Sequence, residues 1–594
     1  MVRRQMILLI LASVILSMTP AARSRAAAPL PAADEWIPRR AIIVLNVRNP
    51  KALLDLALRP QLIEAVEASP VYKAQAANAG FRQFQNVVKS LERRFETNWQ
   101  TVLRRLVGGG VTWAVGPNKG SLIIIDSLDA EVPKGLHDVL LLLAGANAGN
   151  GGQPDAVRPT KVGDVTTWSL SPNQAHAIIG SRLVIASGPK VLKAALDLRA
   201  GAKDKSVASL PAYRQAKKAA GPDAAAILYA NTAVLKHVPN VAKALTGDKN
   251  PLVSLLAAPI TEALRKSTWL ALALKAKGDT LHLDAISDGT IASTGAARFA
   301  LPPQAGDGAL PHLAVPRRIA AMSLHRDLRG FYAAKDELFP ERTSGLIFFE
   351  NMMGIFFTGR DLTEEVLAET GSKVRLVVAE QKFDPAIGTP APQFPAFALV
   401  LPLKDPKKFS LVVEEAWQKA VGLINFTRGQ KAQPGLIIDR PVHRNTKYTV
   451  ACFTPSRKKD RKAVDVRFNF RPALAMPGNH LILSSTDGLA EDIMDALSKE
   501  AAAPARPRAG LHSLIEIEGS QLASILAANR EALIANNMVD KGNTREQAAT
   551  EIGVLQTIVK YFSRVVLTVG TDKGRLKASL QVHLNLPSGK KGGT

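Results

Sequence analysis

The sequence predicts an α+β protein built from two tandem copies of a mostly antiparallel sheet domain with inserted helices. Three observations support this prediction: short sequence matches that recur in the same order in each half, strand-like segments with a period of two, and helices placed between runs of strands. A period of two with one polar face is typical of antiparallel strands that have one side in water. Runs of strands with inserted helices favour α+β over a doubly wound parallel sheet.

The internal repeat is the observation that sets the domain boundaries. The matching segments are Ile37–Ile42 with Val315–Ala320, Phe95–Val115 with Phe357–Val378, Gly180–Asp197 with Gly478–Asp495, and Ser267–Ile286 with Ser563–Val582. Each match is weak alone, but a shared order is hard to produce by chance. The predicted organisation is a first repeat over 27–299, a Pro/Gly linker over 300–314, a second repeat over 315–587 and a flexible tail over 588–594.

The elements of the first copy follow from local residue patterns. The copy opens with a strand over 41–47 and a helix that begins at Asn49-Pro50, where proline takes an early position that needs no donor. The last strand alternates apolar Leu281 and Leu283 with polar neighbours. The other expected elements are a helix over 83–106, a glycine stop at 108–110, strands over 111–115 and 122–126, a helix over 136–143, a flexible loop over 144–152, strands over 166–170, 176–179 and 183–186, a helix over 190–198, and strands over 225–230, 270–276 and 280–286.

The first residues are typical of a secretory signal peptide. Arg3 and Arg4 precede the uncharged run Met6–Met18, which as a helix rises about 20 Å, short of the roughly 30 Å hydrocarbon core of a bilayer. Small residues at Ser24 and Ala26 favour cleavage after Ala26, so residues 1–26 are expected to be removed. The competing interpretation is an uncleaved anchor. We expect an exported protein of the periplasm or cell envelope that is not an integral membrane protein.

The charge balance favours anionic partners. The chain carries 76 Lys and Arg against 51 Asp and Glu, a formal charge of +25. Acidic polysaccharide and lipid head groups are the expected partners, since export disfavours nucleic acid. The densest basic cluster lies between two strand-like runs and is interpreted as a hairpin tip, either a contact for phosphate or carboxylate groups or a solvated turn. The cluster consists of Arg457, Lys458, Lys459, Arg461 and Lys462.

Sequence motifs for catalysis and metal binding are absent. No two of the ten histidines lie within ten residues of one another, so a metal site would need ligands from distant segments. Cys452, the one cysteine, is interpreted as a small buried residue, and Ser187 and Ser485 as turn serines without the glycines of a nucleophile elbow. Glu516 and Glu518 lie two apart on an expected strand, either as an acid/base pair or as part of a polar face.

Three local patterns carry a family resemblance. A strand leads into Asn49–Leu54, a helix ends at Gly108–Gly110 before a strand, and Leu183–Ser187 leads into a helix. In these features the chain resembles the exported bacterial proteins gathered as domain of unknown function 3352. The resemblance covers most of each copy and is clearer in the first half. The family has no established activity, so the resemblance implies no functional residue.

The sequence therefore leaves three functions open. We expect a non-catalytic binding or scaffold role toward an anionic or amphipathic envelope partner, with neither cofactor nor metal. The alternatives are a periplasmic hydrolase with a site assembled from distant residues, and a carrier of a lipid or another hydrophobic ligand. A deep pocket with clustered His, Asp or Ser would favour the hydrolase, a wide apolar groove the carrier, and a flat basic face the scaffold.

Overall fold

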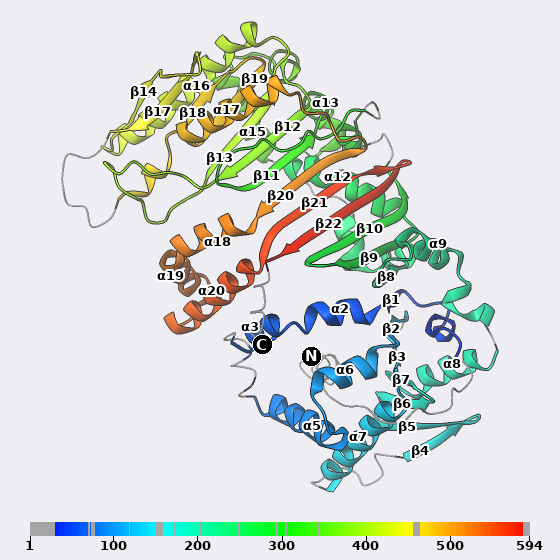
Figure 1. Cartoon of the computed structure of the whole chain (residues 1–594). Coiled ribbons are helices and arrows are strands. Elements are labelled where there is room, and N and C mark those ends of the chain that lie inside the picture. Colours follow the sequence, from blue (N-terminus) through cyan, green and yellow to red (C-terminus); the bar gives the residue numbers. More distant parts are fainter. Residues whose placement is uncertain are drawn as a thin grey trace. The chain divides into compact units, whose positions relative to one another are not determined.

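The computed structural model describes residues 30–585 except 69–71, 73–75, 77, 118, 150–157, 172, 202, 246–249, 292–294, 303, 305, 342–343 and 455–463. The predicted signal peptide (1–26), the basic cluster (457–462) and the predicted tail (588–594) lie outside the described residues. Contacts divide the described chain into two compact units (Figure 1). The first unit comprises 30–242 and 266–289, and the second comprises 243–265 and 290–585.

The first unit contains an antiparallel sheet with the strand order β10-β9-β8-β1-β2-β3-β7-β6-β5-β4. The strands are β1 (Ile43–Val47), β2 (Gly110–Val115), β3 (Ser121–Asp126), β4 (Arg158–Val162), β5 (Val165–Ser171), β6 (Gln174–Ile179), β7 (Arg182–Ala186), β8 (Ala226–Ala230), β9 (Leu270–Lys277) and β10 (Thr280–Thr290). The main helices of this part of the chain are α2 (Pro50–Ala57), α3 (Pro60–Ala68), α5 (Ala79–Phe95), α6 (Trp99–Val107), α7 (Glu131–Gly149), α8 (Pro189–Arg199), α9 (Pro211–Ala220), α10 (Thr232–Leu235) and α11 (Pro239–Leu245).

The second unit contains an antiparallel sheet with the order β22-β21-β20-β11-β12-β13-β19-β18-β17-β14. The strands are β11 (Arg318–His325), β12 (Lys373–Ala379), β13 (Ala396–Pro402), β14 (Leu436–Asp439), β17 (Thr449–Phe453), β18 (Ala473–Ala475), β19 (His480–Ser484), β20 (Leu511–Glu518), β21 (Phe562–Asp572) and β22 (Arg575–Leu584), and β15 (Val442–His443) pairs separately with β16 (Thr446–Lys447). The helices are α12 (Pro251–Lys266), α13 (Leu328–Ala333), α14 (Lys335–Leu338), α15 (Ser344–Phe356), α16 (Pro406–Gln430), α17 (Asp487–Ala502), α18 (Gly519–Ala528), α19 (Arg530–Lys541) and α20 (Arg545–Lys560), with short turns η5 (Leu362–Val366) and η6 (Leu367–Glu369).

The predicted α+β class with mostly antiparallel strands is confirmed, and the strand order is the same in both units. The two serines after β7 and β19 also make the same contact. The Ser187 hydroxyl accepts a hydrogen bond from the backbone N–H of Ser121 at 2.9 Å, and the Ser485 hydroxyl accepts one from Phe397 at 2.9 Å. Each serine thus ties the end of one strand to the first residues of the next strand in the sheet, a structural role.

Two expectations about helices were wrong in detail. The helix expected over 83–106 is two helices, α5 and α6, because Glu96 adopts a φ of 55° and Asn98 caps the start of α6. The loop expected over 144–152 is helical as far as Gly149, as the end of α7. An established helix adds residues at low cost, and the alanines at every second position of this segment offset its glycines.

The central strands of the second unit have two buried faces. Alternate residues such as Ala398 and Ile482 pack against apolar residues of α17, including Ile493. The intervening residues, such as Leu401 and Leu481, point to the opposite face and pack near the beginning of α16. This period-two alternation buries apolar side chains on both sides of the sheet, so helices are needed on both.

A buried arginine fixes α12 to the sheet of the second unit. Arg326, 1% exposed, follows β11, and its guanidinium donates five hydrogen bonds. The acceptors are the carbonyls of Leu255 (2.8 Å), Leu256 (3.2 Å), His325 (2.6 Å) and His512 (3.1 Å) and the hydroxyl of Ser513 (2.9 Å). Pro259 within α12 lacks the N–H that would bond to the Leu255 carbonyl, so Arg326 supplies the missing donor.

We expect Arg326→Leu to lower the free energy of unfolding of the second unit by at least about 3 kcal/mol, because several buried carbonyls lose their donor. Urea unfolding followed by circular dichroism measures this loss. Adding Pro259→Ala to Arg326→Leu should recover part of it, since the introduced alanine would provide an intrahelical N–H for the Leu255 carbonyl. Arg329→Lys, which alters an exposed pair with Glu364, is the control and should change stability little. Equal losses in the single and double variants would contradict the role of Pro259.

Candidate functional site

The second unit contains an apolar cavity of about 950 Å³. Its floor is a patch of four leucines on adjacent strands. Leu399 and Leu401 of β13 lie directly opposite Leu483 and Leu481 of β19 in the antiparallel register. Because residues two apart on a strand share a face, all four side chains point into the same space.

Helices form the other walls of the cavity. On α15, the side chains of Leu346, Phe349 and Met353 recur at helical spacing on one face, and Phe409 and Val413 of α16 close another side. Further lining comes from the beginning of α12, from α13 and from the turns η5 and η6. These residues are Pro251, Leu252, Leu255, Leu328, Phe331, Leu362, Val366 and Leu367.

The polar groups in the cavity wall are bonded to the protein itself. The Tyr332 hydroxyl donates to Glu350 at 3.0 Å, and the Thr370 hydroxyl donates to a backbone carbonyl at 2.8 Å. Asn250 accepts from the backbone at the start of α12 at 2.9 Å. None of the residues described as lining the cavity is a histidine, cysteine, acid, lysine or arginine. The walls therefore present hydrocarbon to whatever occupies the cavity.

The equivalent face of the first unit is filled by helices. Ile123 and Ile125 of β3 lie opposite Ile185 and Leu183 of β7, in strands that hold the same places in the sheet order as β13 and β19. There the four side chains belong to a core cluster with residues of α6 and α7, including Leu106. In the second unit the four leucines likewise belong to a core cluster, with Phe409 and Val413 of α16, and they also line the cavity.

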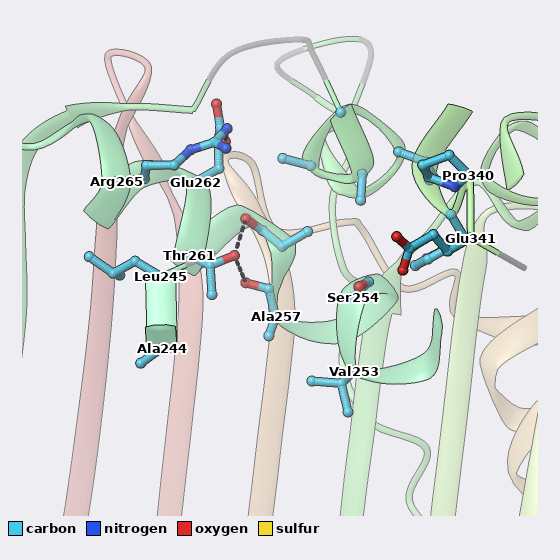
Figure 2. A pocket seen from close by; sticks show the side chains of 16 residues that line it. Ala244, Leu245, Val253, Ser254, Ala257, Thr261, Glu262, Arg265, Pro340 and Glu341 are labelled. Atoms are coloured by element: carbon cyan, nitrogen blue, oxygen red, sulfur yellow. Dashed lines mark hydrogen bonds and ion pairs between the residues drawn. The ribbon is translucent and has the colours of Figure 1, made fainter. Parts of the chain in front are cut away.

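A second pocket of the second unit, about 610 Å³, lies beside α12 and is shown in Figure 2. Glu262 and Arg265 form an ion pair at one end of it, and Glu341 lies at the other. The Thr261 hydroxyl donates to backbone carbonyls of its own helix, as the dashed lines show. Among the described residues of this pocket, Glu262 is paired with Arg265, and Glu341 lies apart from that pair.

The two glutamates singled out in the sequence lie in an ion-pair network. Arg318 contacts both Glu516 and Glu518, the latter at 3.3 Å, and Arg564 contacts Glu516. Burial opposes ionisation of Glu516, but the hydrogen bond from Arg564 and the charge of Arg318 outweigh it and lower the pKa of Glu516. Burial and the neighbouring Glu516 carboxyl raise the pKa of Glu518. These contacts connect β11, β20 and β21 and match the polar-face interpretation.

Two histidines far apart in sequence meet in the first unit. His137 Nδ1 lies 2.9 Å from His176 Nε2, and the His137 ring lies against Trp168. Burial and the neighbouring His137 lower the pKa of His176 to about 4, so the pair is neutral at pH 7. Across the described residues, no group of three or more His, Cys, Asp or Glu side chains is placed to hold a metal ion.

The remaining residues named from the sequence lie outside the described residues or on a strand of the second unit. The basic cluster from Arg457 to Lys462 is outside the described residues, so its anion-binding role stays a prediction. Cys452 is half-buried on β17, opposite Ile437 of β14. In the described part of the chain, every helix is too short or too polar to cross a bilayer.

Sequence reasoning did not identify the cavity residues. Two signals were available: leucines at period two in β13 and β19, and the composition of α15, in which Glu350 is the only charged residue among thirteen. Neither signal distinguishes a packed core from a hollow one, because both patterns are equally typical of buried sheet and helix faces.

Comparison with known proteins adds little. No protein-family model and no curated protein matches the chain. The solved structure of TP0453 in crystal form III matches with 10% identity over 45% of this chain and 82% of that chain, at a TM-score of 0.24. Crystal form I of TP0453 matches with 10% identity over 45% and 81%, at a TM-score of 0.23. Scores this low support no inference, and the family resemblance stays a prediction.

We expect the first unit to lose stability as the pH falls from about 6.5 toward 4. His176 takes up a proton near its ordinary pKa of 6.5 when unfolded but only near 4 when folded, so its contribution is complete above pH 6.5 and is lost below it. The loss is about 3 kcal/mol. Urea unfolding across this range measures it. His176→Gln should flatten the profile, whereas substituting the exposed His237 by Gln should not; identical profiles for both variants would refute the assignment.

Proposed function

We propose that the second unit binds an apolar or amphipathic ligand whose hydrocarbon part occupies the cavity between the sheet and α15. The observation that carries the proposal is a cavity of about 950 Å³ in which leucine, phenylalanine and methionine side chains form the walls. Its volume lies within the range of small-molecule sites, roughly 300–1,000 Å³. Of the three functions left open by the sequence, the carrier is the one that this lining supports.

The energetic case rests on hydrocarbon burial. Moving a methylene group from water into an apolar site is favourable by about 0.8 kcal/mol, so an acyl chain gains strongly even after the cost of ordering it. A charged group in the same place would lose its water without meeting an ionised side chain among the described lining residues, and a hydrogen-bonding group would compete with the bonds that Tyr332, Thr370 and Asn250 already make. The lining therefore favours an acyl or isoprenoid chain over a sugar, nucleotide or peptide.

The proposal also includes export of the protein and duplication of its domain. An exported carrier in two tandem copies accords with the signal-like first residues and with the amphipathic partner expected from composition. Identical strand order in the two units supports duplication. In this scheme the first copy kept a filled sheet face and the second opened the same face for a ligand.

We expect Leu483→Trp to lower the affinity for a fluorescent fatty acid such as cis-parinaric acid by at least about ten-fold, because the indole fills the space above the leucine patch. Fluorescence titration of the full chain, stripped of any co-purifying lipid, measures the affinity. Ile437→Trp, an equally large change at a 56% exposed position of β14, is the matched control.

Thermal unfolding of both variants shows whether they are folded. Unchanged affinity in Leu483→Trp with an intact fold would overturn the proposal, as would failure of the parent chain to bind the fatty acid. Native mass spectrometry of the protein from its producing cells supplies a second readout, and a bound lipid absent from Leu483→Trp would support the assignment.

A further inference from the structure

The mouth of the apolar cavity is bordered by exposed apolar side chains. Phe349 of α15 and Leu252 of α12 both line the cavity, yet they are 41% and 70% exposed. A side chain that belongs to the wall and is also open to solvent marks the opening. A hydrocarbon ligand thus passes an apolar rim on its way in.

The helix at this opening is apolar on its outer side as well as its inner side. Leu346 and Met353 point into the cavity, whereas Ile347, Phe348 and Ile355 point outward and are 45%, 64% and 66% exposed. A helix that is apolar all round is ordinarily covered on every side. With thirteen residues α15 is about 20 Å long, too short to cross a bilayer but long enough to lie in its surface.

The neighbouring helix α16 extends this apolar surface. The Lys419 amine lies 3.4 Å from the Ile355 carbonyl and 2.6 Å from the Thr358 hydroxyl, so the stripe of α16 that contains Lys419 contacts the end of α15. Leu411 and Phe426, 74% and 64% exposed, lie on the same stripe by helical spacing. We call the outward side chains of both helices the docking face: Ile347, Phe348, Ile355, Leu411 and Phe426.

The charges around the docking face suit an anionic surface. Lys404 just before α16 and Lys407 and Lys408 in its first turn are exposed, close to Leu411, where the helix dipole adds positive potential. The Lys404 amine donates to the Ala368 carbonyl at 2.6 Å and Lys408 lies 3.6 Å from Glu369, so Lys407 is the cation of the three for which the structure gives no such contact. The three carboxylates on α15 and α16 have basic partners: Glu350 with Lys335, Glu414 with Arg440, and Glu415 with Arg360 and Lys419. Exposed apolar side chains flanked by lysines are typical of helices that lie in the head-group region of a bilayer.

We infer that the docking face seats on the surface of an anionic lipid bilayer, with α15 in the interface and the cavity mouth facing the lipid. This inference rests on the proposed function, because a water-insoluble ligand needs a membrane to enter from or return to. Seating buries Phe348 and Ile355 among acyl chains while the lysines reach phosphate groups. The ligand then moves between bilayer and cavity without crossing water.

Flotation of the full chain with phosphatidylglycerol-containing vesicles tests the inference. We expect the parent chain to float with these vesicles and to be released by high salt and by exchange for phosphatidylcholine vesicles. The double substitution Phe348→Ser with Ile355→Ser should reduce the bound fraction at least about ten-fold, because two large apolar side chains no longer partition. Val539→Ser, at an 83% exposed position of α19, is the matched control and should float like the parent.

The cavity and the docking face are separable in the same experiment. Leu483→Trp should still float while losing cis-parinaric acid, and the double serine variant should keep cis-parinaric acid while failing to float. Normal flotation of the double serine variant, or failure of the parent chain to float, overturns the docking inference and leaves the cavity proposal standing. If the parent chain does not bind vesicles and the double serine variant differs from it in mass in solution, the docking face would instead be assigned to contact with a second copy of this chain. This outcome also overturns the inference.

Discussion

The second unit depends on one buried arginine. Arg326 is almost inaccessible to solvent and its hydrogen-bond partners are four carbonyls and a hydroxyl. Burial lowers its pKa to about 10, which leaves it charged at neutral pH. The cost of burying this charge is offset because each N–H of the guanidinium has an acceptor. One acceptor is the Leu255 carbonyl, which Pro259 leaves without an intrahelical donor. The proline leaves a carbonyl of α12 without a donor, and the arginine bonds to that carbonyl and so holds α12 on the sheet.

The position of α12 matters because this helix borders the apolar cavity and the pocket shown in Figure 2. Its first turns contribute Leu252 and Leu255 to the apolar cavity, and its later turns carry Glu262 and Arg265 beside the second pocket. Arg326 bonds to the carbonyl of Leu255, which itself lines the apolar cavity, and to the carbonyl of the next residue, Leu256. A shift of α12 would change the cavity mouth directly, so the hydrogen bonds that anchor the helix also define the size of the proposed ligand site.

The two units contain sheets with the same strand order, but different helices lie over corresponding patches of the two sheets. Corresponding apolar patches on β3 and β7 and on β13 and β19 have the same register. In the first unit helices α6 and α7 pack directly on the patch. In the second unit the chain between β12 and β19 contributes the long helix α16, while α15 stands over the patch at a distance that leaves a cavity. The difference lies in the helices, since the sheet faces are nearly equivalent in residue type.

The sequence by itself determined the class of fold and most of its elements. Period-two alternation, proline at helix starts and glycine at helix ends are local signals, and they placed β1, β3, β7 and α8 close to where they are. Local signals failed where a helix was broken at Glu96 or continued through Gly149, because a single backbone angle or the propagation of an existing helix decided the outcome. Tertiary structure alone decided that four leucines surround a space, that Arg326 meets Leu255, and that His137 meets His176. Each of these contacts joins residues distant in sequence, and a one-dimensional pattern shows that a side chain is buried without showing what it is buried against.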